Sequence, residues 1–143
     1  MQARAASALA LVRDAARLFN YISGSSFILQ EQYGFNTTLL TNATRYDILA
    51  ALNTLREKLT ENDNLLIYYA GHGEVDETAN KGFWLPVDAE QDNPRNWISN
   101  VAISDILNTL KSNHVMVVAD SCYAGTLSVA ALPRVDESIS DEM

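Results

Sequence analysis

The single cysteine of the chain follows a histidine at a spacing that would let the two side chains share one catalytic site. His72 lies between two glycines in the stretch YYAGHG, and Cys122 lies 122 − 72 = 50 residues later in the stretch DSCYAG. A free thiol has a pKa of about 8.5 and is a poor nucleophile near neutral pH. A nearby imidazole can take its proton, stabilise the thiolate and later protonate a leaving amine. We therefore predict that Cys122 is a nucleophile and that His72 is its base.

The backbone around this pair has a second predicted role, which is to bind developing negative charge. Glycines beside His72 leave room for a substrate backbone, and the N–H groups of Gly73 and Cys122 could converge on the oxygen of a tetrahedral intermediate. Simpler readings exist, because a lone cysteine at a strand end is often an inert buried thiol and a histidine can cap a turn. The pairing of the two motifs favours catalysis. His114 opens a strand and is interpreted as structural or solvated.

The elements that must position these residues alternate between helix and strand. Continuous apolar runs indicate buried strands at 65–70 and 114–119, and GFNTTLL at 34–40 indicates a shorter strand. Helical spacing follows a capping box at 44–47 and recurs over 103–110, and GFWLPVDA is extended up to Pro86. This alternation predicts a three-layer α/β/α domain, doubly wound around a mainly parallel sheet. The runs 65–70 and 114–119 should be adjacent strands, with His72 and Cys122 facing each other at their carboxyl ends.

The N-terminal segment is predicted to be a helix rather than a signal peptide. In ALALVRDAARLFNYI, six apolar side chains fall near one helical face; they are Leu9, Leu11, Val12, Ala15, Ala16 and Phe19.

Composition limits the class of partner and compartment. The 143 residues are 48% hydrophobic, which is typical of one globular domain. A net charge of −8 argues against a nucleic-acid or anionic-membrane surface, and no apolar run approaches the ~18 residues that span a bilayer. One cysteine forms no internal disulfide, and with two histidines it matches no zinc-ligand spacing. We expect a reducing, cytoplasmic compartment, and interpret Trp84 and Trp97 as core or loop anchors.

The two motifs resemble those of the caspase–metacaspase group of cysteine peptidases. A histidine about 50 residues before the cysteine is a known feature of caspases. Asp120 and Ser121 stand where animal caspases have glutamine and alanine, and this form is similar to metacaspases and their bacterial relatives. GFWLPVDA and NWIS also look like bacterial members of the group, and the resemblance runs from about Tyr33 to Leu127. It implies a caspase-like fold and a cysteine endopeptidase that acts on proteins or peptides.

The resemblance also implies a role in specificity for Asp120. In metacaspases the acid two residues before the cysteine helps line the pocket for the side chain that precedes the scissile bond, and a carboxylate there selects arginine or lysine over aspartate. On composition alone, a carboxylate after a strand usually accepts local N–H bonds instead. With a basic preference, Arg134 becomes a plausible self-processing site.

Calcium is a further family possibility, because some metacaspases require it. A calcium site needs about six converging oxygens, and the aspartates of this chain are scattered, so we predict no metal and no other cofactor. The aspartates concerned are Asp76, Asp88, Asp92 and Asp105.

The chain departs from the family pattern in what flanks the motifs. With a helix expected at the start, the family's first strand is expected to be missing, and SSFIL at 25–29 is a partial substitute. Nothing after Leu127 resembles the family's later strands, so we expect an incomplete caspase-like domain over 1–133 and a mobile acidic tail over 134–143. Unpaired sheet edges favour an oligomer or association with the rest of a parent protein. Two functions follow: an endopeptidase, or a caspase-like regulatory module that is inactive alone.

Overall fold

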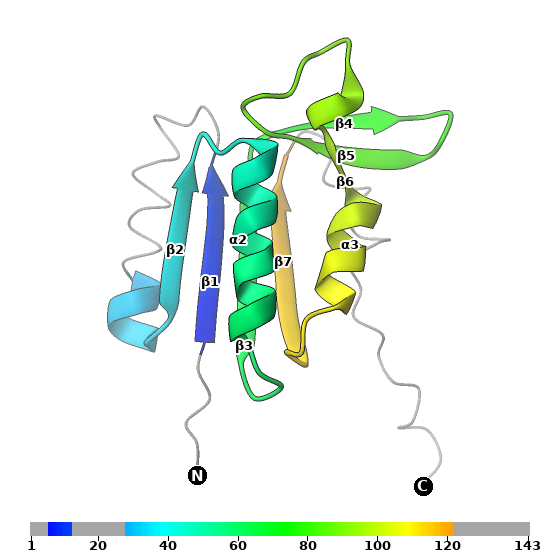
Figure 1. Ribbon diagram of the computed structural model, residues 1–143. Helices are drawn as coiled ribbons and strands as arrows, with labels where there is room; N and C mark the ends of the chain where they lie inside the picture. Colours follow the sequence, from blue (N-terminus) through cyan, green and yellow to red (C-terminus); the bar gives the residue numbers. More distant parts are fainter. Residues whose placement is uncertain (1–5, 13–27, 122–143) are drawn as a thin grey trace, which may run out of the picture.

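The computed structural model describes residues 6–12 and 28–121, in which a parallel sheet forms the centre (Figure 1). Its strand order is β2-β1-β3-β7, and every neighbouring pair is parallel. The strands are β1 (Ala6–Val12), β2 (Asn36–Thr41), β3 (Asn64–Ala70) and β7 (His114–Asp120). The expected α/β class with a mainly parallel sheet is therefore confirmed.

Strands β3 and β7 are hydrogen-bonded neighbours, as the two apolar runs predicted. Their register pairs Leu65 with Val115 and Ala70 with Asp120, so both strands end at the same edge of the sheet. Residues 65, 67 and 69 of β3 are all buried, each with at most 2% of its surface exposed. Residues 66 and 68, on the other face, are partly buried, so neither face is fully solvated and the strand shows a continuous apolar run.

One face of the main sheet is covered by helices α2 (Arg45–Lys58) and α3 (Asn100–Asn108), which lie in front of it in Figure 1. Thr44 begins α2 with the predicted capping box: its hydroxyl accepts the N–H of Asp47, and the Asp47 carboxylate accepts the N–H of Thr44. The shared core joins helix side chains to alternate strand side chains. Its most buried members are Leu9, Leu11, Ile48, Leu52, Leu65, Ile67, Tyr69, Trp84, Ile98 and Ile103.

The N-terminal prediction was wrong, because residues 6–12 form a strand in the interior of the sheet. β1 pairs with β2 on one side and β3 on the other, so the first strand that we expected to be missing is present. Alanine and leucine are strong helix formers, but burial on both faces of a sheet overrides so weak a preference. The rest of the predicted helix, over 13–19, lies outside the described residues.

The proposed substitute strand SSFIL was also wrong where it is described. Residues 28–33 are helical. Gly34 lies between this helical segment and β2, and its φ of 68° is in the left-handed region that favours glycine.

A smaller antiparallel sheet lies above the carboxyl edge of the main sheet in Figure 1. It contains β4 (His72–Asp76), β5 (Lys81–Leu85) and β6 (Ile98–Ser99) in that order. β5 ends immediately before Pro86, as predicted. The loop that follows is tied to the start of α2, since Val87 N donates to Ala43 O and Arg45 N donates to the Asp88 carboxylate.

Candidate active site

The two sequence motifs meet where β3 and β7 end. The N–H of Gly71 donates a 3.3 Å hydrogen bond to the carbonyl of Asp120, which extends the pairing of the strands by one residue. A Cβ added to Gly73 would lie 3.1 Å from Oγ of Ser121. The stretch around His72 therefore packs against the residue that directly precedes Cys122. This juxtaposition at the carboxyl edge is the position in which open α/β sheets bind ligands.

His72 is the first residue of β4 and is exposed. Its backbone pairs with Leu85 across the small sheet, and its carbonyl accepts a 2.6 Å hydrogen bond from the Tyr69 hydroxyl. Cys122, including the N–H assigned to the oxyanion hole, lies outside the described residues. The Cys122–His72 pair thus stays a prediction, although the backbones leading to both residues converge.

The glycines on either side of His72 each have a close intramolecular neighbour. A Cβ on Gly71 would come within 2.7 Å of the Tyr69 hydroxyl oxygen, closer than real Cβ contacts allow. A Cβ on Gly73 would press on the hydroxyl of Ser121 and would lie at van der Waals distance, 3.4 Å, from the carbonyl of Phe83. Neither glycine has a positive φ. Their small size is needed for packing against Tyr69 and Ser121, a reason the sequence analysis did not identify.

Asp120 is exposed at the end of β7, and its carboxylate accepts a 3.3 Å hydrogen bond from the hydroxyl of Tyr68. Both side chains therefore lie on the face of the sheet opposite the one that carries Tyr69. The sequence analysis did not single out Tyr68. The signal was available, because side chains two residues apart share a face and Tyr68 alternates with the buried Ile67 and Tyr69.

The two tryptophans are anchors, as interpreted. Trp84 is 1% exposed, and its ring stacks on Tyr69 at 4.3 Å between centroids with 4° between the planes. Trp97 donates from Nε1 to the carbonyl of Glu90 and meets Phe83 edge to face. His114 is exposed at the amino end of β7, at the opposite end of the strand from Asp120.

Carboxylates near the small sheet serve local structure. Asp76 accepts the N–H of Ala79 in the β4–β5 turn, and Asp88 accepts the N–H of Arg45. Within residues 6–12 and 28–121 there is no group of three or more His, Cys, Asp or Glu side chains that could hold a metal ion.

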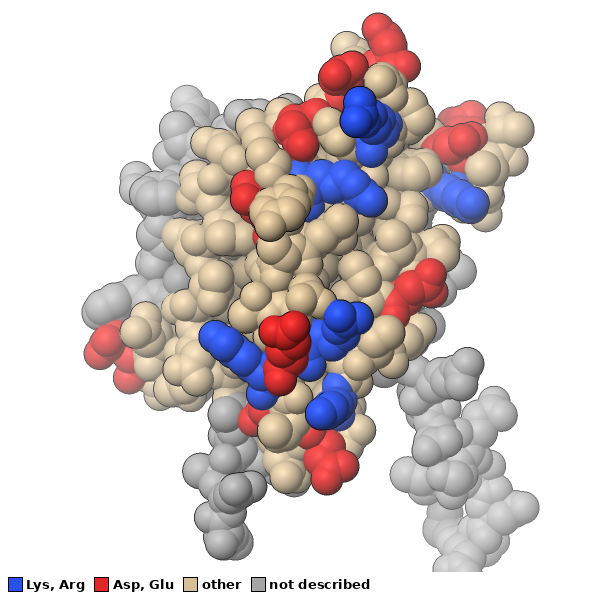
Figure 2. Space-filling model, in the orientation of Figure 1, with Lys and Arg blue, Asp and Glu red and all other residues tan. Residues whose placement is uncertain are grey.

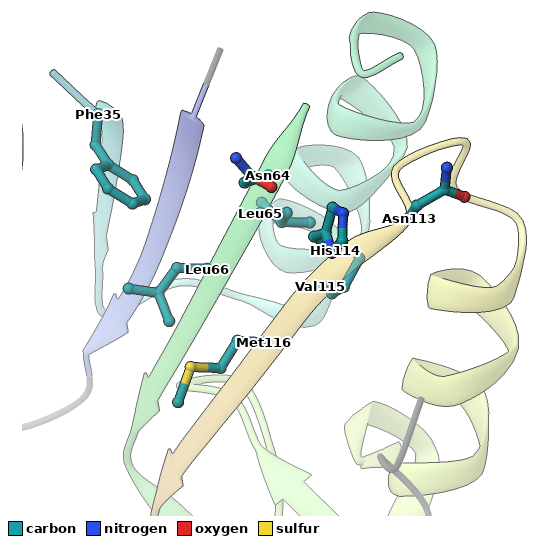
Figure 3. Close-up of a pocket in the computed structure, with 8 residues that line it drawn as sticks. All are labelled: Phe35, Asn64, Leu65, Leu66, Asn113, His114, Val115 and Met116. Atoms are coloured by element: carbon teal, nitrogen blue, oxygen red, sulfur yellow. The ribbon is translucent and has the colours of Figure 1, made fainter. Parts of the chain in front are cut away.

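A hollow of about 370 Å³ lies at the amino ends of β3 and β7, far from the motif residues along these strands (Figure 3). Leu66 and Met116 line it on the face away from α2, and Met116 is 62% exposed. Ligand crevices of parallel sheets lie beyond the carboxyl ends instead, so this hollow is not assigned to the active site.

Charge on the described surface is mixed. Figure 2 shows Lys and Arg interspersed with Asp and Glu towards both ends of the helix-covered face, with a mainly uncharged band between them. No helical segment in the described part of the chain combines the length and hydrophobicity of a transmembrane span.

Comparison with known proteins agrees with this arrangement. Residues 25–142 match the family model described as the caspase domain, a longer stretch than the Tyr33–Leu127 resemblance. The crystal structure of protein GSU0716 from Geobacter sulfurreducens has a similar fold, with a TM-score of 0.62 and 23% identity over 82% of this chain. The match covers 50% of that chain, so the present chain spans about half its length. No curated protein gives a match.

Three findings lead to one conclusion. Strands β3 and β7 are adjacent in a parallel sheet, the stretches that lead to His72 and Cys122 are joined at one edge of it, and the family match covers most of the chain. The chain belongs to the caspase-domain family, a family of cysteine peptidases.

Proposed function

We propose that this protein is a cysteine endopeptidase of the metacaspase type that cleaves peptide bonds after arginine or lysine. The observation that carries the proposal is the contact between the two motifs: Gly71 N donates to Asp120 O, and Gly73 packs against Ser121. These contacts bring the stretch that carries His72 to the same sheet edge as Ser121, the residue directly before Cys122. The proposal pairs His72 with Cys122 across 50 residues of sequence (122 − 72).

The proposed reaction passes through an acyl-enzyme. The thiolate of Cys122 attacks the scissile carbonyl carbon, and the resulting oxyanion is held by the N–H groups of Gly73 and Cys122. The C–N bond breaks as the imidazolium of His72 gives its proton to the leaving amine. Water, deprotonated by the neutral imidazole, then hydrolyses the thioester and releases the carboxylic acid.

Asp120 is the proposed selector of the substrate side chain. Its carboxylate is exposed and accepts a long hydrogen bond of 3.3 Å from one phenol hydroxyl, a donor that carries no charge. A guanidinium can replace or share that bond through two charge-assisted hydrogen bonds, whereas an aspartyl side chain would be repelled. Tyr68 thereby becomes a second wall of the same pocket. A cytoplasmic setting, in which a thiol stays reduced, fits this chemistry.

The decisive experiment is active-site labelling of the full chain with a peptidyl-arginine reagent that alkylates thiolates. We expect labelling of the wild type, none of Cys122→Ala, and a loss of at least 100-fold in rate for His72→Ala. A matched peptidyl-aspartyl reagent should not react. His114→Ala is the control for the loss of a histidine and should label at the wild-type rate.

Asp120→Asn separates specificity from catalysis. It should lower kcat/KM for arginyl peptides by about 10- to 100-fold, the 1.4–3 kcal/mol of a charge-assisted bond, without affecting alkylation by a small neutral reagent. An unchanged kcat/KM would reduce Asp120 to a strand-end residue. Failure of the wild type to label at all would favour the alternative, a regulatory caspase-like module that is inactive on its own.

A further inference from the structure

The hydroxyl of Tyr69 joins the main sheet to the small sheet at the candidate base. Tyr69 lies in β3 and is 2% exposed. Its hydroxyl donates to the carbonyl of His72 at 2.6 Å and lies 3.4 Å from the carbonyl of Leu85, the register partner of His72 on β5. One buried group thus contacts both strands of the β4–β5 hairpin at the end that carries His72.

The position of this hydroxyl is restricted on two sides. The Tyr69 ring is stacked nearly parallel on the buried ring of Trp84, which itself belongs to β5. On the other side, the hydroxyl occupies the space in which Gly71 would otherwise carry a Cβ, at 2.7 Å. Any larger residue at 71 would displace the hydroxyl from the His72 carbonyl. The first glycine of YYAGHG therefore has a function in holding this contact.

We propose that Tyr69 is a positioning residue for His72. This inference rests on the proposed function, in which His72 is the catalytic base. His72 is exposed at the start of β4, and productive proton transfer requires its imidazole to stay within hydrogen-bond reach of the thiol. The buried hydroxyl fixes the backbone of His72 to the rigid core and so limits the positions of its side chain.

The test is Tyr69→Phe, which removes the hydroxyl and keeps the stacked ring. We expect kcat for arginyl peptides to fall about 10- to 100-fold, the loss typical of a displaced catalytic group, with KM changed less than twofold. Tyr46→Phe is the matched control, because it removes a phenol hydroxyl that is 79% exposed on α2. Its kinetics should equal those of the wild type.

Imidazole NMR supplies a readout that does not depend on activity. The chain has two histidines, and His114 lies at the far end of the main sheet, so it is an internal control. In Tyr69→Phe the His72 ring signals should shift or broaden while those of His114 stay unchanged.

The possible outcomes are distinct. Wild-type kcat with unchanged His72 signals would overturn the positioning role. Altered NMR signals of both His72 and His114, together with a large loss of kcat and a changed KM, would also overturn it, because they would indicate a general loss of structure. An inactive wild type would contradict the proposed function, and the His72 signals would then decide the role of Tyr69 alone.

Discussion

The contact between Gly73 and Ser121 can be tested as a packing interaction, independently of catalysis. Glycine inside a strand is about 0.5–1 kcal/mol less stable than alanine, so Gly73→Ala would stabilise the protein if the new methyl group met open space. It would instead lie 3.1 Å from Ser121 Oγ, with Ser121 Cβ and the carbonyl of Phe83 at 3.4 Å. Overpacking of this kind costs about 1–3 kcal/mol. We expect Gly73→Ala to lower the free energy of unfolding by about 1 kcal/mol.

Removal of the Ser121 hydroxyl should reverse the sign of the effect of Gly73→Ala on the free energy of unfolding. In a Ser121→Ala background the nearest remaining contacts are at 3.4 Å, an ordinary van der Waals distance. Gly73→Ala should then stabilise by about 0.5 kcal/mol. The difference between the two backgrounds is a coupling of about 1.5 kcal/mol, which is roughly 5 °C in Tm for a domain of this size.

Urea unfolding of the wild type, both single variants and the double variant measures this coupling. Ser104→Ala in α3 is the control serine, since it is not among the nearest neighbours of a Cβ at position 73. Its combination with Gly73→Ala should be additive. A coupling below about 0.5 kcal/mol between Gly73 and Ser121, the ordinary error of additivity, would refute the packing of Gly73 against the Ser121 hydroxyl.

Three further predictions concern the helices that cover the sheet. Thr44→Ala should lower the free energy of unfolding by about 1 kcal/mol through loss of the N-cap, whereas Thr54→Ala, in the exposed interior of the same helix, should change it by less than 0.5 kcal/mol. Hydrogen bonds from Thr44 lower the pKa of Asp47 below its usual 3.8. The stabilisation by the Asp47 carboxylate is therefore complete above pH 3.8 and is lost as the pH falls through the folded pKa. The stability difference between wild type and Asp47→Asn, measured from pH 6 to pH 2, should vanish at the acid end, and a constant difference would contradict this. Leu52→Ala, at a fully buried position, should lower the free energy of unfolding in urea by about 2–5 kcal/mol. Val101→Ala, at a position that is 48% exposed, should lower it by less than 0.5 kcal/mol. Equal losses would place Leu52 outside the core.

Much of the fold was readable from local patterns. The runs 65–70 and 114–119 are long enough, apolar enough and bounded clearly enough by turn residues to predict two buried strands, and the helical segment between them predicts a parallel pair. Thr44 and Asp47 predicted the start of α2 because a capping box is a local interaction, complete within four residues. The two motifs and their spacing predicted the family because they resemble those of caspases and metacaspases, and the match to the caspase domain confirms the family.

What the sequence could not decide depended on contacts between distant residues. ALALV is compatible with a helix by propensity, and it becomes a strand because β2 and β3 supply hydrogen bonds on both sides and α2 covers Leu9 and Leu11. The tether between Tyr69 and His72 is likewise absent from the pattern YYAGHG, since both glycines could equally be turn residues. Periodicity and spacing record what a residue prefers locally, whereas burial, and the few ångströms that separate a hydroxyl from a carbonyl, are set only when the two sheets pack together.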